Sequence, residues 1–188
     1  GRVPKGAYPQ RSVLYFTNPD YTGAMDEAQR TFWSDVGQWL LSAEVTKAFV
    51  DIFRPVLQSR FNGHVNLHSE ACLMRDAPGY ALGPHTDSPR KVVSVLFYLP
   101  DPLTTHPTTI PYHNIGTSLY VPKDREFTCA GGPHHPHDGF DRVLTVPFLS
   151  NTMFAFAKTD KSFHGVERVE DGAPCRELML YDIFREAA

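Results

Sequence analysis

The chain has 188 residues, of which 41% are hydrophobic and 21% are charged, and its formal net charge is −3. This length and balance predict a single globular domain, with no membrane span and no basic run that would bind nucleic acid. The three cysteines are scattered along the chain, which is a poor disulfide framework and favours a reducing, cytoplasmic setting.

The first part of the chain, residues 1–63, is predicted to be helical. Apolar side chains recur there at spacings of three and four, which indicates an amphipathic helix over about residues 24–41. These side chains are Met25, Ala28, Phe32, Val36 and Leu40. A second helix is predicted over about residues 43–61, with Ser42 as its N-cap and a kink or break at Pro55.

The remainder of the chain is predicted to be rich in short strands separated by Gly, Pro, Asp and Asn. This texture indicates a mostly β domain, a sandwich or jelly roll, with the two helices covering one face. The stretches 101–116 and 123–141 are long loops, which we expect to border a substrate mouth and to be the least ordered part. The expected strands lie near residues 65–74, 80–87, 91–99, 117–121, 142–148, 152–157, 163–169 and 175–184.

His85 and Asp87, two residues apart at the end of a predicted strand, are the first two residues of a candidate metal site. Residues two apart in a strand face the same side, so an imidazole and a carboxylate can converge. A second histidine from a distant strand would complete the two-histidine, one-carboxylate triad that is typical of non-haem Fe(II) oxygenases. His164, 79 residues further on (164 − 85), is the candidate.

A candidate anion site lies on the last predicted strand. Arg176 stands near its start, and a guanidinium group is well shaped to bind a carboxylate through two hydrogen bonds. Arg168 is the rival, but it would share a strand face with His164 and lie close to the metal.

The order of these motifs resembles the 2-oxoglutarate- and Fe(II)-dependent dioxygenases, in particular the prolyl 4-hydroxylase-like branch. The similarity covers residues 65 to 184, about two thirds of the chain. In two respects the chain departs from the family: Arg176 lies further beyond His164 than is common, and Leu178 stands where a Ser or Thr is frequent. The matching pieces are RDAPGYALGPHTD, VVSVLFYLP, GTSLYVP, LSNTMFAF, FHGV and CRELMLYDIF.

The resemblance implies a double-stranded β-helix, also called a cupin-like jelly roll, over residues 64–186 of a single domain spanning 1–188. It implies Fe(II) on His85, Asp87 and His164, and 2-oxoglutarate with its distal carboxylate on Arg176. It also implies cosubstrate contacts by Tyr80 and Tyr98. The implied reaction uses O2 to hydroxylate a small-molecule or peptidyl substrate and releases succinate and CO2, with ascorbate as a candidate reductant.

Several residues and two other functions are left open by the sequence. Arg75, Arg90 and His113 are candidate substrate contacts, and His106 could equally border the substrate mouth or be inert. The histidines 134, 135 and 137 fit a solvated loop better than a second metal site. The alternative functions are a cupin-like metal enzyme that does not use 2-oxoglutarate and a non-catalytic β-sandwich binding module.

Overall fold

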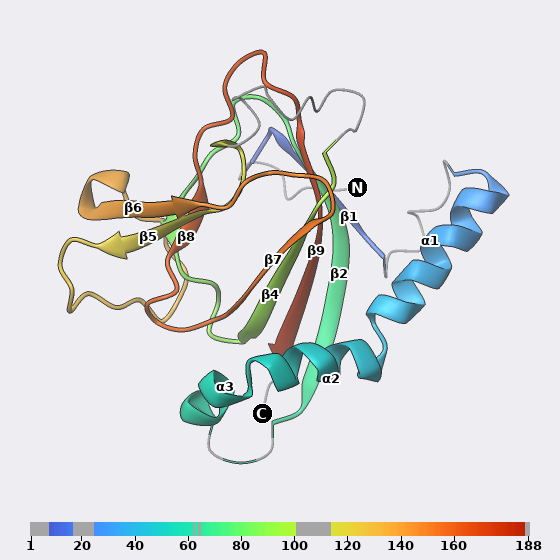
Figure 1. Ribbon diagram of the computed structural model, residues 1–188, viewed down its shortest axis with the longest axis horizontal. Coiled ribbons are helices and arrows are strands. Elements are labelled where there is room, and N and C mark those ends of the chain that lie inside the picture. The colour runs from blue at the N-terminus through green and yellow to red at the C-terminus, as the bar shows by residue number, and fades with distance from the viewer. Residues whose placement is uncertain (1–7, 17–24, 62, 64, 101–113, 187–188) are drawn as a thin grey trace.

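The computed structural model describes residues 8–16, 25–61, 63, 65–100 and 114–186 (Figure 1). The predicted first helix is α1, Glu27–Leu40, which begins at a capping box formed by Asp26 and Gln29. The predicted second helix is two helices, α2 (Ala43–Ile52) and α3 (Arg54–Arg60). As predicted, Ser42 caps α2, and the break falls next to Pro55 because proline cannot donate the hydrogen bond that would continue the helix.

The strands form two antiparallel sheets. The larger contains β1 (Arg11–Tyr15), β2 (Leu67–Asp76), β9 (Arg176–Arg185), β4 (Lys91–Tyr98) and β7 (Thr152–Ala157), in that order. The smaller contains β3 (Leu82–His85), β8 (His164–Val166), β5 (Ser118–Pro122) and β6 (Phe140–Thr145).

The pairing of the strands shows a double-stranded β-helix. The strands pair in nested fashion, β5 with β6, β4 with β7, β3 with β8 and β2 with β9, as in one long hairpin. That hairpin is rolled up, because β4 also pairs with β9 and β5 with β8. The predicted fold class, a mostly β jelly roll, is therefore confirmed.

The helices α2 and α3 pack on the larger sheet, as expected. Leu40, Val45 and Leu57 from the helical region share one apolar cluster with residues of β2, β4 and β9. A second cluster, which includes Leu96 and Val166, joins residues of the two sheets. The cavity described below lies between these two sheets, so the fold supplies its walls from both.

Two expectations about strands need correction. Strand β1 was not predicted; it extends the jelly roll by pairing with the edge of β2. The strand expected over 80–87 is only Leu82–His85, so Asp87 lies beyond its end, just before a turn that Lys91 closes by donating its backbone N–H to the carbonyl of Ser88. Residues 101–113 of the first long loop lie outside the described residues, and the second loop includes a short 3-10 helix, His137–Gly139.

No helix within the described ranges is long and apolar enough to cross a membrane. The three cysteines, Cys72, Cys129 and Cys175, are free.

Candidate functional site

Three side chains that could bind a metal converge at one end of a cavity. His85 ends β3 and His164 begins β8, and the pairing of these strands places the two residues opposite each other. The potential ligand atoms of His85, Asp87 and His164 all lie within 4.8 Å of one another. The structure therefore brings together the three residues that the sequence suggested as metal ligands.

Both imidazoles present the same nitrogen to this point. The Nδ1 atoms of His85 and His164 lie 3.0 Å from the carbonyl oxygens of Gly83 and Ser162, respectively. A carbonyl can only accept, so each Nδ1 carries the proton and each Nε2 keeps a free lone pair. Metal-binding histidines are commonly oriented in this way.

Burial keeps both histidines neutral. Desolvation, with a contribution from neighbouring His164, lowers the pKa of His85 to about 3. Desolvation also lowers the pKa of His164. Neutral imidazoles are the form that binds a metal, so neither side chain needs to lose a proton at neutral pH.

The carboxylate of Asp87 is held by two neighbours. Ser94 Oγ donates to Oδ2 over 3.0 Å, and the ammonium of Lys91 lies 3.1 Å from Oδ1. Burial alone would raise the pKa of Asp87, but the charge and the hydrogen bond of Lys91, together with the neighbouring histidines, outweigh it and the pKa falls to about 2. Lys91 also pairs with the buried Asp182 over 2.9 Å.

These donors fit a divalent metal ion. Two neutral imidazoles and one ionised carboxylate form the donor set of two-histidine, one-carboxylate centres, which leave coordination positions open to other ligands. Within the described residues, no other group of His, Cys, Asp and Glu side chains converges in this way.

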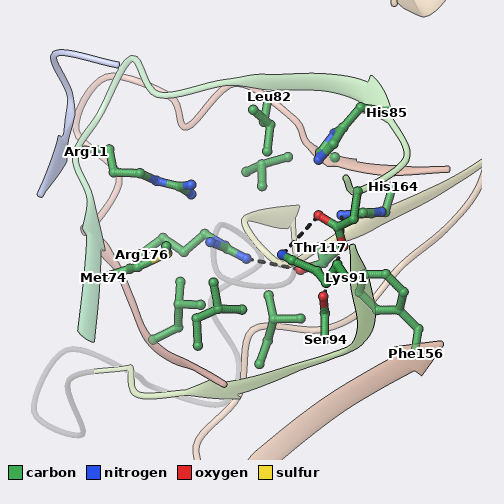
Figure 2. Close-up of a pocket in the computed structure, with 16 residues that line it drawn as sticks. Arg11, Met74, Leu82, His85, Lys91, Ser94, Thr117, Phe156, His164 and Arg176 are labelled. Carbon is green, nitrogen blue, oxygen red and sulfur yellow. Dashed lines mark hydrogen bonds and ion pairs between the residues drawn. The ribbon is translucent and has the colours of Figure 1, made fainter. Parts of the chain in front are cut away.

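A small cavity extends from the triad between the sheets (Figure 2). Its volume is about 110 Å³, well below the roughly 300–1,000 Å³ of sites for drug-sized ligands. His85 and His164 lie at one end, and Arg11 and Arg176 point into the other. The walls between are mainly apolar, formed by Met74, Leu82, Leu96, Phe156, Val166, Leu178 and Leu180.

Arg176, and not its rival Arg168, lies in the cavity. It is 1% exposed, donates from Nη1 to Asp76 over 2.8 Å and from Nη2 to Thr117 Oγ1 over 3.0 Å. Its Nε is buried without a hydrogen-bond partner among the described residues. Arg168 is mostly exposed and pairs loosely with Asp171.

Thr117 supplies a hydroxyl group to the cavity that the sequence analysis did not identify. Its Oγ1 accepts from both Tyr98 Oη, at 2.9 Å, and Arg176 Nη2, so its own proton is left for another acceptor. Thr117 lines the cavity as Leu178 does, and so offers the hydroxyl that Leu178 lacks. Thr117 is the second residue of the GTSLYVP piece, and its place in that family-like piece was the signal that could have identified it from the sequence.

The two predicted tyrosines are close to the cavity but do not line it. Tyr98 acts through Thr117, since its Oη also accepts from the backbone N–H of that residue over 3.0 Å. Tyr80 is fully buried beneath the guanidinium of Arg11, and its hydroxyl has no partner among the described residues.

The two candidate substrate contacts that the structure describes lie outside the cavity. Arg75 is an exposed residue of β2 that pairs with Glu177 over 3.2 Å, and Arg90 is exposed in the turn before β4. Neither lines the cavity. His106 and His113 lie outside the described residues.

One histidine of the second long loop stands at the rim of the site. The ring centroid of His134 lies 4.6 Å from that of His85, and its Nδ1 is 3.0 Å from Tyr8 Oη. His135 packs instead against Phe127, Phe140 and Phe163. Within the described residues, the histidines 134, 135 and 137 belong to no group of converging ligand atoms.

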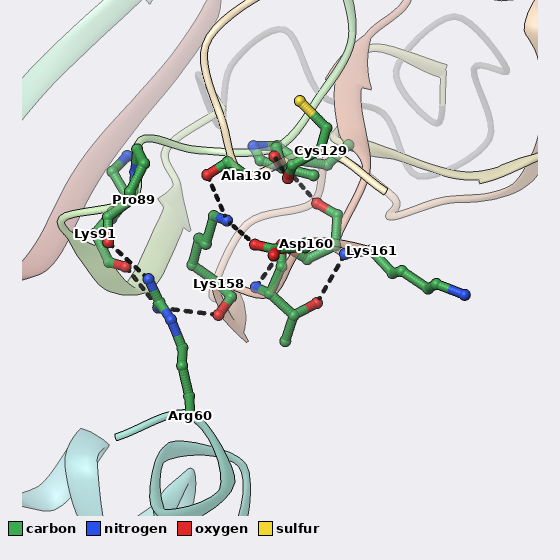
Figure 3. Close-up of polar contacts among 12 residues, drawn as sticks. Arg60, Pro89, Lys91, Cys129, Ala130, Lys158, Asp160 and Lys161 are labelled. Atoms are coloured by element: carbon green, nitrogen blue, oxygen red, sulfur yellow. Dashed lines mark hydrogen bonds and ion pairs between the residues drawn. The ribbon is translucent and has the colours of Figure 1, made fainter. Parts of the chain in front are cut away.

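Polar contacts fix this loop and the segment 86–91, which includes Asp87 (Figure 3). Lys158 Nζ donates to the carbonyl of Ala130 over 2.8 Å, and Thr86 Oγ1 donates to that of Cys129 over 2.7 Å. Arg60 donates to the carbonyls of Pro89 and Lys91 over 2.7 and 2.8 Å. At Gly131 a Cβ would lie 2.2 Å from the carbonyl oxygen of Asp87, so only glycine allows this close approach.

Comparisons with known proteins find distant likenesses only. No family model matches the chain, and no curated protein matches its sequence. Among solved structures, a prolyl-4-hydroxylase from Pseudomonas putida aligns over 94% of this chain and 73% of its own, with a TM-score of 0.47 and 14% identity. A DMSP lyase from Ruegeria pomeroyi aligns over 63% and 38%, with a TM-score of 0.27 and 11% identity. The assignment of the fold rests on the strand order of the chain itself.

Proposed function

We propose that this protein is a non-haem Fe(II) oxygenase that uses 2-oxoglutarate as cosubstrate and hydroxylates a small-molecule or peptidyl substrate. The observation that carries the proposal is a single cavity with complementary ends. One end holds three metal donors, and the other holds a buried arginine with an unused donor, Nε of Arg176. A small acid with a chelating head and a distal carboxylate matches both ends.

At the metal end, His85, Asp87 and His164 would hold Fe(II), which when bound supplies the activation of dioxygen. The chain's own contribution is to present both Nε2 lone pairs and an ionised carboxylate at neutral pH. Lys91 and Ser94 bind the two oxygens of Asp87 and so fix the orientation of that side chain.

At the far end, Arg176 and Thr117 would bind the distal carboxylate of 2-oxoglutarate. Hydrogen bonds from a guanidinium to a carboxylate are strong, and the buried setting strengthens them further. The apolar walls, including Leu82 and Leu178, exclude water from the length of the cosubstrate between its two polar ends. A cavity of about 110 Å³ suits the cosubstrate, so we place the substrate outside it, at the rim near His134.

In the overall reaction, 2-oxoglutarate, O2 and a substrate C–H give succinate, CO2 and the hydroxylated substrate. One oxygen atom of O2 enters succinate and the other enters the product. Ascorbate would serve as an external reductant that keeps the iron in its Fe(II) state between turnovers.

The test measures turnover of the cosubstrate. Protein loaded with Fe(II) is mixed with O2, ascorbate and 2-oxoglutarate labelled at its 1-carboxylate, alone and with pools of small molecules and peptides. We expect labelled CO2 and unlabelled succinate to form in equal amounts. One of the pools should increase the rate at which both form, and that pool should yield a product heavier than its substrate by one oxygen atom. The His164→Ala variant should release neither.

Two results would contradict the proposal. A product formed without succinate would indicate a cupin-like metal enzyme that does not use 2-oxoglutarate. Bound ligands without any chemical change, in protein shown to hold Fe(II), would indicate a binding module.

A further inference from the structure

The far end of the cavity contains a second arginine, supplied by a strand that lies outside the rolled hairpin. Arg11 is the first residue of β1 and stands opposite Asp76 of β2, which in turn stands opposite Arg176 of β9. Two guanidinium groups therefore flank one carboxylate, side by side across three strands. Figure 2 shows Arg11 and Arg176 pointing into the same cavity.

Asp76 is the internal partner of both arginines. It is fully buried and accepts from Arg11 Nε over 2.6 Å and Nη2 over 2.9 Å, and from Arg176 Nη1 over 2.8 Å. Arg11 is bound twice to this carboxylate, and Arg176 is bound once to it and once to Thr117, so each guanidinium group is held at two points and has little freedom to rotate.

Among the residues that the structure describes, the charges of this cluster do not balance. Two guanidinium groups and one carboxylate leave one positive charge in a largely buried place. A buried charge without a partner is costly, so such a cluster has a strong affinity for one anion. Tyr80 contributes only the face of its ring, 4.3 Å from the guanidinium carbon of Arg11.

Unused donors of both arginines mark where that anion would bind. Arg176 Nε and Arg11 Nη1 have no hydrogen-bond partner among the described residues. Arg11 also lines the cavity. Its contacts with Asp76 use only Nε and Nη2, so no described residue occupies the N–H groups of Nη1, which can donate to a ligand.

From these contacts we infer that Arg11 and Arg176 form a two-arginine clamp for one carboxylate, with Asp76 as the fixed counterion that positions both. The inference rests on the proposed function and deepens it, since the carboxylate would be the distal one of the 2-oxo acid. The site then selects 2-oxo dicarboxylates over 2-oxo monocarboxylates by means of a residue from β1.

The experiment compares two acids that share a chelating head. Calorimetric titrations of 2-oxoglutarate and of pyruvate, which lacks the distal carboxylate, are carried out on Mn(II)-loaded protein. The variants are Arg11→Met, Arg11→Lys and, as a matched surface control on the neighbouring strand, Arg75→Met. Asp76 keeps its bond to Arg176 in both Arg11 variants, and thermal melting checks that each is folded.

We expect Arg11→Met to weaken binding of 2-oxoglutarate by roughly 10- to 100-fold, the effect of losing a hydrogen bond between charged groups. Binding of pyruvate should be unchanged, Arg11→Lys should be intermediate, and Arg75→Met should resemble the wild type. A folded Arg11→Met protein that binds 2-oxoglutarate like the wild type would overturn the clamp. Equal losses for both acids would also overturn it and show a structural role. A wild-type protein that binds neither acid would overturn the proposed function itself, and the clamp with it.

Discussion

The two ends of the cavity are held in place by different kinds of contact. At the metal end, the imidazoles of His85 and His164 are each oriented by a carbonyl two residues earlier in the chain. At the arginine end, the partners are remote in sequence. Arg176 lies 100 residues from Asp76 and 59 from Thr117, and Arg11 lies 65 residues from Asp76.

This difference shows how one fold can support two kinds of site. A local backbone contact fixes a histidine as soon as its own strand forms, whereas the arginine end is complete only when β1, β2 and β9 are in register. Changes at the metal end should therefore weaken metal binding and, through the lost metal, binding of the acid ligand as well. Changes at the arginine end should act on the acid ligand and leave the metal in place.

The largest effect is expected for the three metal donors. Replacing His85, Asp87 or His164 by Ala removes one of three protein ligands, so the affinity for Mn(II) should fall by more than the roughly 10- to 100-fold that loss of an outer partner costs. His134→Ala is the matched control, because its ring lies close to His85 but belongs to no donor group. Calorimetry with Mn(II) measures both, and equal losses in the control would show that the loop, rather than the triad, determines metal binding.

The next largest effect concerns Lys91, which makes one contact that is local in sequence, with Asp87, and one that is remote, with Asp182. Lys91→Met removes the cation between Asp87 and Asp182 and leaves two buried carboxylates without it. We expect the free energy of unfolding of the metal-free protein to fall by about 3–5 kcal/mol, measured by urea denaturation. The Lys91→Met/Asp182→Asn double variant should recover part of this loss. A change below about 1 kcal/mol would mean that the Lys91 pair resembles an exposed ion pair.

A comparable effect on ligand binding is expected for Arg176. Truncating one partner of a buried charged pair costs about 2–5 kcal/mol, so Arg176→Met should weaken binding of 2-oxoglutarate by about 30- to several-thousand-fold. The affinity for Mn(II) should not change, because Arg176 contacts none of the metal donors. Arg168→Met is the matched control and should bind like the wild type. Reversed outcomes for the two variants would move the anion site to Arg168.

The smallest effect is expected from pH. A proton competes with the metal for each histidine, so a histidine pair with ordinary pKa values near 6.5 would lose about 100-fold in metal affinity by about pH 5.5. Burial lowers the pKa of His85 to about 3 and also lowers that of His164, which moves this loss to lower pH. We therefore expect the affinity for Mn(II) to change only a few-fold between about pH 7.5 and 5.5. A fall of about 100-fold in the same titrations would show that both histidines titrate as if exposed.

The same contrast explains how much the sequence could predict. His85 and Asp87 form a short pattern, and His164 and Arg176 follow it in an order that matches a family, so residues of both ends were found. Arg11, Asp76 and Lys91 were missed because no motif marks them. The contacts between the two arginines and Asp76, and that of Lys91 with Asp182, depend on strand register, which the sequence pattern does not specify.

The fold shows a similar division. The alternation and turn residues after Gly63 predicted a jelly roll, and Pro55 predicted the break between α2 and α3. Strand β1 has only five residues and precedes the helices, so its pairing with β2 is a tertiary event without a local signal. Asp87 lies beyond β3 because the chain turns at Ser88, and the strand alternation that suggested its position does not apply there.

The central claim is that one 2-oxo acid spans the cavity from the metal to the arginines. The most direct test is a calorimetric titration of 2-oxoglutarate into the wild-type protein, with Mn(II) and without it. We predict one binding site per chain when Mn(II) is present and much weaker binding when it is absent, because the chelating head then loses its partner. The account would be contradicted if no binding occurs with the metal bound, or if the affinity is the same without it.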